Sequence, residues 1–114
     1  MITLYGIKNC DTVKKARKWL DENRVEYRFH DFREDGLSRR QVEDWISELG
    51  WEQVINKRST SWKMLDANAR ASMDASSALT AILQSPTLIK RPLLDTGERR
   101  HTGFKAESYK ALLL

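Results

Sequence analysis

The sequence predicts an α/β fold in one domain, and three features of its residue pattern lead to this prediction. A short apolar strand, an amphipathic helix and a second strand follow one another at the N-terminus, which is the order of a β-α-β unit. The middle of the chain has the apolar spacing of helices. The remainder carries short strands around a proline and ends in a helix. At 114 residues, the chain has the length of one ordinary domain.

The β-α-β unit comes first along the chain. Residues 2–5 indicate a buried strand, and Asp11 or Thr12 is placed to cap a helix that runs to about Asn23. Three apolar residues recur on one face of this helix: Val13, Ala16 and Leu20. Residues 27–32 alternate in polarity and indicate a second strand. Two strands joined by one helix over so few residues are expected to run parallel.

Helices are expected through the middle of the chain. Ser38 and Gln41 have the spacing of a capping box, and Gly50 stands where the same helix should end. A short helix is expected around three apolar residues that follow a Ser-Thr-Ser stretch: Trp62, Met64 and Leu65. A further helix is expected to begin at Asp74 or Ala75 and to stop at Pro86, because a proline ends a helix.

The C-terminal part is expected to complete the sheet. Residues 87–90 and 93–95 flank Arg91-Pro92 and have the composition of strands. A turn then leads to a returning strand over residues 99–102. A last helix from about Lys105 is expected to bury three residues: Tyr109, Leu112 and Leu113.

Composition and charge narrow the class of protein. The chain has no run of about 18 apolar residues and its first residues lack the pattern of a signal peptide, so a cytoplasmic protein without a membrane partner is expected. The net charge of +4 arises from basic residues scattered among acidic ones, which favours solvated surface over direct binding of nucleic acid. A single cysteine excludes an intramolecular disulfide framework, and with two distant histidines it argues against a structural zinc site.

Cys10 is the first candidate for chemistry. It lies in a loop that follows the first expected strand and leads into the first helix. Ligands of α/β sheets bind at the carboxyl ends of parallel strands, and the free N–H groups at a helix N-terminus stabilise a thiolate. Cys10 is therefore expected to be a reactive thiol. The alternative is an inert cysteine that acts as a small apolar residue.

The absence of a second cysteine limits the thiol chemistry of the chain. A Cys-x-x-Cys motif resolves its own mixed disulfide, whereas here Val13 stands three residues after Cys10. A disulfide or a sulfenic acid on Cys10 therefore needs an external thiol. Glutathione is the expected co-substrate, and no tightly bound cofactor is expected.

The dipeptide Arg91-Pro92 is the second informative segment. A proline between two apolar strands removes a ladder donor and indicates a sheet edge, a bulge or a cis peptide bond. Arg91 is a surface charge beside a turn unless the fold brings it to Cys10. In that case its guanidinium would stabilise a thiolate or bind an oxyanion.

With these segments in view, the chain resembles the ArsC-like family along its whole length, and most of all the YffB-type branch. Four segments carry the resemblance: residues 4–16, 56–59, 88–93 and 103–104. The resemblance implies a thioredoxin-like fold, with a four-stranded mixed sheet and an inserted helical segment. The implied single domain covers residues 1–114, with a core of about 1–32 and 87–114 and an insertion of about 33–86. It further implies a glutathione-dependent thiol reductase.

The resemblance also implies roles for individual residues. Cys10 aligns with the nucleophilic cysteine of the family, Arg91 with an oxyanion-binding arginine, and Pro92 with the cis-proline that follows it. Arg91 is thereby expected to face Cys10. Three further residues are expected to take part in binding the substrate or glutathione: Asn9, Thr12 and Arg58.

Arsenate reductases of the same family supply one alternative. Their glutaredoxin-coupled members have a histidine where this chain has Gly6 and a serine where it has Val13. Of their three arginines, Arg91 matches clearly and Arg58 lies about two positions from the expected place. A tetrahedral oxyanion needs several converging cations. Arsenate reduction coupled to glutathione and a glutaredoxin is therefore the second hypothesis for the function.

Spx-like regulators supply an alternative of a different class. They resemble this chain at Arg58-Ser59 and at Gly103-Phe104, and the resemblance implies binding to the RNA polymerase alpha subunit without catalysis. Many of them carry a Cys-x-x-Cys redox switch, which Val13 precludes here.

Overall fold

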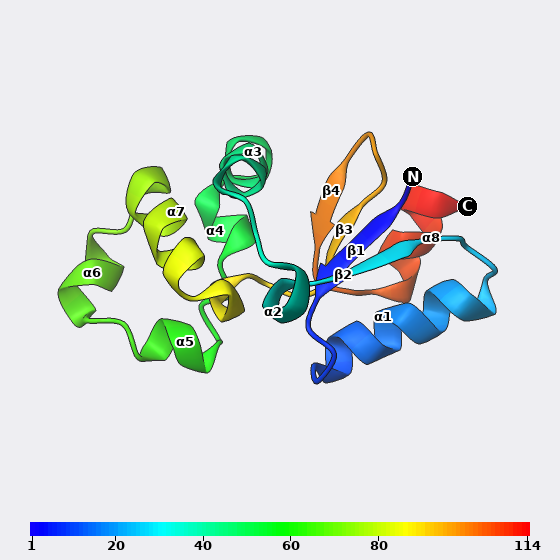
Figure 1. The fold of residues 1–114 in the computed structure, drawn as a ribbon, viewed down its shortest axis with the longest axis horizontal. Helices are drawn as coiled ribbons and strands as arrows, with labels where there is room; N and C mark the ends of the chain where they lie inside the picture. The colour runs from blue at the N-terminus through cyan, green and yellow to red at the C-terminus, as the bar shows by residue number, and fades with distance from the viewer. The chain divides into compact units, whose positions relative to one another are not determined.

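The computed structural model describes residues 1–114, which form four strands, eight α-helices and one 3-10 turn (Figure 1). Their bounds, in chain order, are β1 Thr3–Gly6, α1 Asp11–Glu22, β2 Arg28–Asp31, α2 Phe32–Asp35, α3 Arg39–Leu49, α4 Trp51–Val54, α5 Thr60–Lys63, α6 Ala67–Ala71, α7 Ala75–Gln84, η1 Pro86–Leu88, β3 Leu93–Asp95, β4 Arg100–Thr102 and α8 Ala106–Leu113. The chain divides into two compact units, one formed by Met1–Gly36 with Arg91–Leu114, and the other by Leu37–Lys90.

The first unit contains one four-stranded mixed sheet in the order β2-β1-β3-β4. β1 pairs in parallel with β2, as the β-α-β pattern predicts, and antiparallel with β3. β3 in turn pairs antiparallel with β4. The predicted α/β class and the four-stranded mixed sheet are therefore confirmed.

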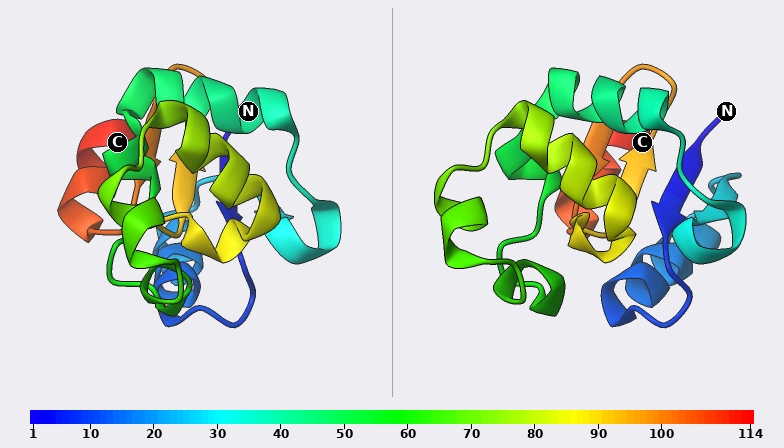
Figure 2. Two further views of the ribbon diagram at one scale, coloured as in Figure 1. Left: turned by 90° about the vertical axis from the view of Figure 1, so that its left-hand side faces the viewer. Right: turned by 60° about the vertical axis from the view of Figure 1, so that its left-hand side comes forward.

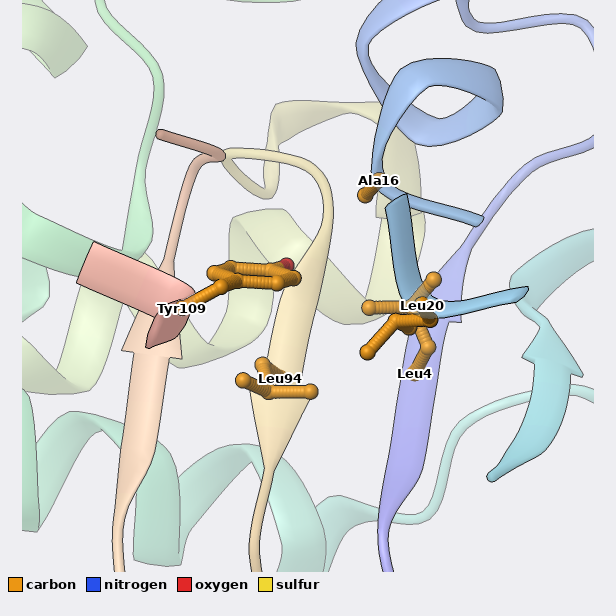
Figure 3. Close-up of a cluster of buried hydrophobic side chains, with 5 residues drawn as sticks. All are labelled: Leu4, Ala16, Leu20, Leu94 and Tyr109. Atoms are coloured by element: carbon orange, nitrogen blue, oxygen red, sulfur yellow. The ribbon is translucent and has the colours of Figure 1, made fainter. Parts of the chain in front are cut away.

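One face of this sheet carries the apolar core of the first unit. Leu4 of β1 lies opposite Leu94 of β3, and both side chains are fully buried. Ala16 and Leu20 of α1 and Tyr109 of α8 pack on them (Figure 3). α1 and α8 therefore cover the same face. Full burial of one leucine stabilises the fold by roughly 1.5–3 kcal/mol.

The second unit is built from helices. The predicted capping box opens α3: the Ser38 side chain accepts from the Gln41 amide, and the Gln41 side chain accepts from the Ser38 amide. Asp74 and Ser77 form the same motif at α7. α3 and α7 lie side by side in both views of Figure 2. None of the helices in the structure has the length and apolar character that a membrane span needs.

The strand expected over residues 87–90 does not form. Pro86 opens a 3-10 turn, and Ile89 makes only an isolated bridge with Ile55. The reason is that Ile55 follows α4 directly and offers too short a partner for a ladder. The short helix expected around Trp62, Met64 and Leu65 forms as α5 and ends before Met64, which is exposed. Helices α2, α4 and α6 were not expected, because four or five residues are too few to show a helical repeat.

Val13 of helix α1 packs closely against Gly6 at the end of β1. A Cβ atom added at Gly6 would lie 2.7 Å from Val13 Cγ2 and 3.2 Å from Cγ1. Val13 is fully buried, so its methyl groups have little room to yield. Glycine at position 6 is thus required by the contact with Val13.

We expect Gly6→Ala to destabilise the protein by about 1–3 kcal/mol, because the new methyl group overpacks the site. In a Val13→Ala background, the same substitution should cost close to nothing. Urea unfolding of the two single variants and the double variant measures this coupling. Additive effects of the two substitutions would contradict the contact.

The hydroxyl of Tyr109 is buried without a hydrogen-bond partner. The ring is fully buried and meets Trp19, His101 and Phe104 edge to face. Burial raises the pKa of the Tyr109 hydroxyl above its usual value. The hydroxyl is therefore a cost to the folded state rather than a contribution.

Tyr109→Phe should raise the free energy of unfolding by about 1 kcal/mol, because it removes an unpaired buried hydroxyl and keeps the ring contacts. Thermal and urea unfolding measure the effect. A clear loss of stability would show instead that the hydroxyl is bonded in the folded protein.

Candidate functional site

One end of the sheet in the first unit is formed by the carboxyl ends of three strands and the first residue of the fourth. This end of the sheet is called its edge below. β1 ends at Gly6, which lies opposite Asp31 at the end of β2. β3 begins at Leu93, opposite both Tyr5 and Thr102. The ends of β1, β2 and β4 and the beginning of β3 therefore meet there. This is the edge at which α/β sheets bind ligands.

Cys10 lies at this edge, at the N-terminus of α1. It is the N-cap residue, in extended conformation, and its thiol makes no capping hydrogen bond. Its amide donates to the Ile7 carbonyl at 3.4 Å, and its carbonyl accepts from the Lys14 amide at 3.0 Å. The side chain is partly exposed. A partly exposed thiol at the positive end of a 12-residue helix suits nucleophilic chemistry.

Arg91 and Pro92 approach the same edge from β3. The Arg91-Pro92 peptide bond is cis, as the resemblance implied. Leu93 lies opposite Tyr5, so continuing the register past the end of the pairing puts Pro92 at the level of Gly6 and Arg91 at the level of Ile7. Pro92 is fully buried, and its carbonyl accepts from the Gly103 amide at 2.9 Å.

The guanidinium of Arg91 carries an unsatisfied donor. Its Nη1 atom is buried and has no hydrogen-bond partner, although the residue as a whole is partly exposed. Buried polar atoms in proteins are nearly always paired. A guanidinium with a spare donor is suited to a carboxylate or another oxyanion, which it binds through two parallel N–H groups.

Asp31 supports the loop that precedes Cys10. Its carboxylate is buried and accepts from the Lys8 amide at 3.2 Å. The Lys8 ammonium is bonded to Glu34 at 2.9 and 3.0 Å, and this hydrogen bond, with the charge of Glu34, raises the pKa of Lys8. A hollow of about 160 Å³ lies here, bounded by Ile7, Lys8, Asn9, Asp31, Arg33 and Glu34.

Asp31 was not recognised from the sequence as a site residue. It was interpreted only as part of a strand that alternates in polarity. The signal that could have found it is the spacing of Asp31 and Glu34, since an acidic cap followed three residues later by glutamate is typical of a helix start.

The other candidates fall in both units. Asn9 and Thr12 flank Cys10 in sequence and are exposed, so they lie at the same edge as the thiol. Arg58 belongs to the helical unit, Leu37–Lys90. There its amide donates to the Asn56 side chain at 3.0 Å, and its own side chain is exposed. The roles of these residues remain predictions. No group of three or more His, Cys, Asp or Glu side chains is placed to hold a metal ion.

Comparison with protein families gives a match to the ArsC family over residues 5–112, nearly the whole chain. The chain belongs to the ArsC family. This confirms the resemblance seen in the sequence.

Solved structures and a curated relative resemble this chain over most or all of their length. The solved structure of a protein named YffB is 44% identical, with a TM-score of 0.95 and complete coverage of both chains. An arsenate reductase (ArsC)-related protein from Brucella melitensis is 38% identical, with a TM-score of 0.81, over 99% of this chain and 95% of that one. The global transcriptional regulator Spx of Streptococcus pneumoniae is 30% identical over 99% of this chain and 86% of its own length.

We expect sulfate to stabilise the protein through Arg91, since an oxyanion would occupy the unpaired guanidinium. The rise in melting temperature with sulfate should be smaller in Arg91→Met than in the wild type. Arg99→Met, which removes an exposed arginine from the same unit, is the matched control and should respond like the wild type. Equal responses of all three proteins would rule out anion binding at Arg91.

Proposed function

We propose that this ArsC-family protein is a monothiol reductase that uses glutathione as its co-substrate. The observation that carries the proposal is a partly exposed cysteine at the N-terminus of α1, at the same sheet edge as an arginine with an unpaired, buried guanidinium nitrogen. Cys10 is the nucleophile. Arg91 holds an oxyanion or carboxylate of the substrate and favours the thiolate by its charge. The proposed setting is the cytoplasm, where glutathione is abundant.

The proposed reaction is a pair of thiol–disulfide exchanges. The Cys10 thiolate attacks a mixed disulfide between the substrate and glutathione, forms a bond to the glutathione sulfur and releases the substrate thiolate, which takes up a proton. A second glutathione thiolate then attacks the disulfide on Cys10 and releases glutathione disulfide. In the net reaction the substrate sulfur is reduced to a thiol, the sulfur of the second glutathione is oxidised to the disulfide level, and the Cys10 thiolate leaves and is restored. An external thiol is needed because the chain has no second cysteine.

Pro92, Asn9 and Thr12 are proposed to bind the thiol partners. Asn9 and Thr12 are exposed on either side of Cys10 and offer polar groups to a peptide-like ligand. The pairing of Leu93 with Tyr5 places the backbone of the Pro92 segment at the same end of the sheet. A glutaredoxin could then regenerate Cys10 in place of free glutathione, by the same exchange.

Arsenate reduction remains a less favoured form of the proposal. It finds support in the likeness to an arsenate reductase-related protein. Against it stands the contact between Gly6 and Val13, which fills the positions where family arsenate reductases have a histidine and a serine. Of the arginines expected for a tetrahedral oxyanion, only Arg91 is a clear match. A disulfide substrate needs fewer cationic side chains in the site than a tetrahedral oxyanion does.

A regulatory role is the second candidate function, because the chain is 30% identical to a transcriptional regulator along nearly its whole length. The partner proposed for this role is the RNA polymerase alpha subunit. A binding experiment with purified alpha subunit tests it. Equal binding by Cys10→Ser would separate this role from thiol chemistry.

Cys10→Ser should abolish glutathione-dependent reduction of 2-hydroxyethyl disulfide, since no other thiol can form the mixed disulfide. Reduction is followed by NADPH consumption in an assay coupled to glutathione reductase. The wild type treated with oxidised glutathione should gain one glutathione by mass spectrometry, and Cys10→Ser should gain none. Arg91→Met should lower kcat/KM by about tenfold or more, whereas Arg99→Met leaves it unchanged.

Unchanged turnover in Cys10→Ser would refute the reductase. A wild type without turnover but with strong binding of the alpha subunit would favour the regulatory role instead.

A further inference from the structure

We propose that Asp31 is a positioning residue, whose buried carboxylate fixes the loop that presents Cys10. This inference rests on the proposed function, because it assumes that the reactivity of Cys10 matters. Asp31 ends β2 opposite Gly6 and is only 4% exposed. A buried carboxylate is costly to the fold unless donors surround it. The groups that donate hydrogen bonds to the Asp31 carboxylate therefore indicate its role in the structure.

The two carboxylate oxygens of Asp31 serve different segments. Oδ1 accepts from the amides of Arg33 and Glu34, at 2.8 and 3.4 Å, and so caps α2. Oδ2 accepts from the Lys8 amide at 3.2 Å. Lys8 lies two residues before Cys10, whereas α2 follows Asp31 directly. One side chain thus joins the cysteine loop to the end of β2.

The loop has few other constraints. Residues 7–10 belong to no helix or strand, and the Cys10 amide makes only a long hydrogen bond of 3.4 Å to Ile7. The Lys8 side chain is held by Glu34, but both partners are more than half exposed. An exposed ion pair of this kind contributes little. Beside the buried side chain of Ile7, the partly buried hydrogen bond from Lys8 to Asp31 is therefore the polar anchor of the loop.

This anchor has a consequence for Cys10. The reactivity of a thiolate at a helix N-terminus depends on its position relative to the first free N–H groups, and the helix field weakens within one turn. A loop released from Asp31 leaves Cys10 attached to α1 but free to move at its N-terminal side. Displacements of about 1 Å at such a site lower rates by up to about 100-fold.

Asp31→Asn separates the two roles of the side chain. An asparagine keeps one acceptor oxygen and replaces the other with an NH₂ group. The oxygen is expected on the α2 side, where two amides donate, which leaves the NH₂ group facing the Lys8 N–H. The cap of α2 is then kept, and the anchor of the loop is lost. Glu34→Gln is the matched control, because it also removes one negative charge beside Lys8 but keeps the Lys8 backbone bond.

Two measurements are needed, both under conditions where the variants are folded. In Asp31→Asn, amide exchange at Lys8 should become about tenfold faster, while the Arg33 amide and the α1 amide of Leu20 keep their protection. The rate of Cys10 alkylation by iodoacetamide should fall about tenfold. Glu34→Gln should stay within about twofold of the wild type in both measurements.

Unchanged exchange at Lys8 would overturn the proposal, and so would faster exchange at Lys8 with unchanged alkylation. Alkylation needs neither glutathione nor a reductase substrate, so the anchor can be upheld even if the wild type shows no turnover. A reductase that works in the wild type and is unaltered in Asp31→Asn would instead refute the anchor and leave the proposed function standing.

Discussion

The register of β1 with its two neighbours is the constraint on which the rest of the site depends. β1 runs parallel to β2 and antiparallel to β3, so its carboxyl end coincides with the end of β2 and the beginning of β3. Cys10, Asp31 and Arg91 are far apart in sequence, yet this pairing brings their segments to one edge. A shift of one residue would turn Leu4 from the core to the opposite face. The core that α1 and α8 bury therefore also holds the geometry of the site.

Gly6 and Val13 stand where arsenate reductases of the family have a histidine and a serine. Because these two residues contact each other, the two departures from that pattern form one structural feature. With Val13 packed on the backbone, position 6 has no space even for a methyl group. A histidine there is thus incompatible with the present packing of α1. The polar groups that histidine and serine would supply are replaced by an apolar contact. The helix N-terminus and the Arg91 segment are then left at this end of the sheet as features that favour negative charge, which is fewer than a multiply charged oxyanion needs.

The parts of the fold that were predictable are those where one local pattern decides the outcome. The cap Ser38 and the stripe of α1 confirm this, because hydrogen bonds and periodicity act within a few residues, although the N-cap of α1 is Cys10 and not Asp11 or Thr12. Residues 87–90 misled the prediction because strand formation depends on a partner, and Ile55 offers a single bridge. In the site, Cys10 and Arg91 stand out by residue type and neighbours. Asp31 does not, because its importance lies in a hydrogen bond to Lys8, which only the pairing of β1 with β2 makes possible.

Arg91 and Tyr109 share one local feature but differ in what it implies. Each has a buried polar atom without a hydrogen-bond partner, which folded proteins rarely retain. The Tyr109 hydroxyl is enclosed in the apolar cluster that α1 and α8 form on the sheet, where no ligand can reach it. The unpaired hydroxyl therefore destabilises the fold without serving a binding function. Arg91 is partly exposed, at the sheet edge that carries the cysteine loop. An arginine with one buried, unpaired nitrogen and a partly exposed side chain is preorganised for an anion, because the fold has already desolvated part of it. The partial exposure of the arginine around its buried, unpaired nitrogen, rather than burial alone, therefore makes Arg91 a candidate for binding an anion.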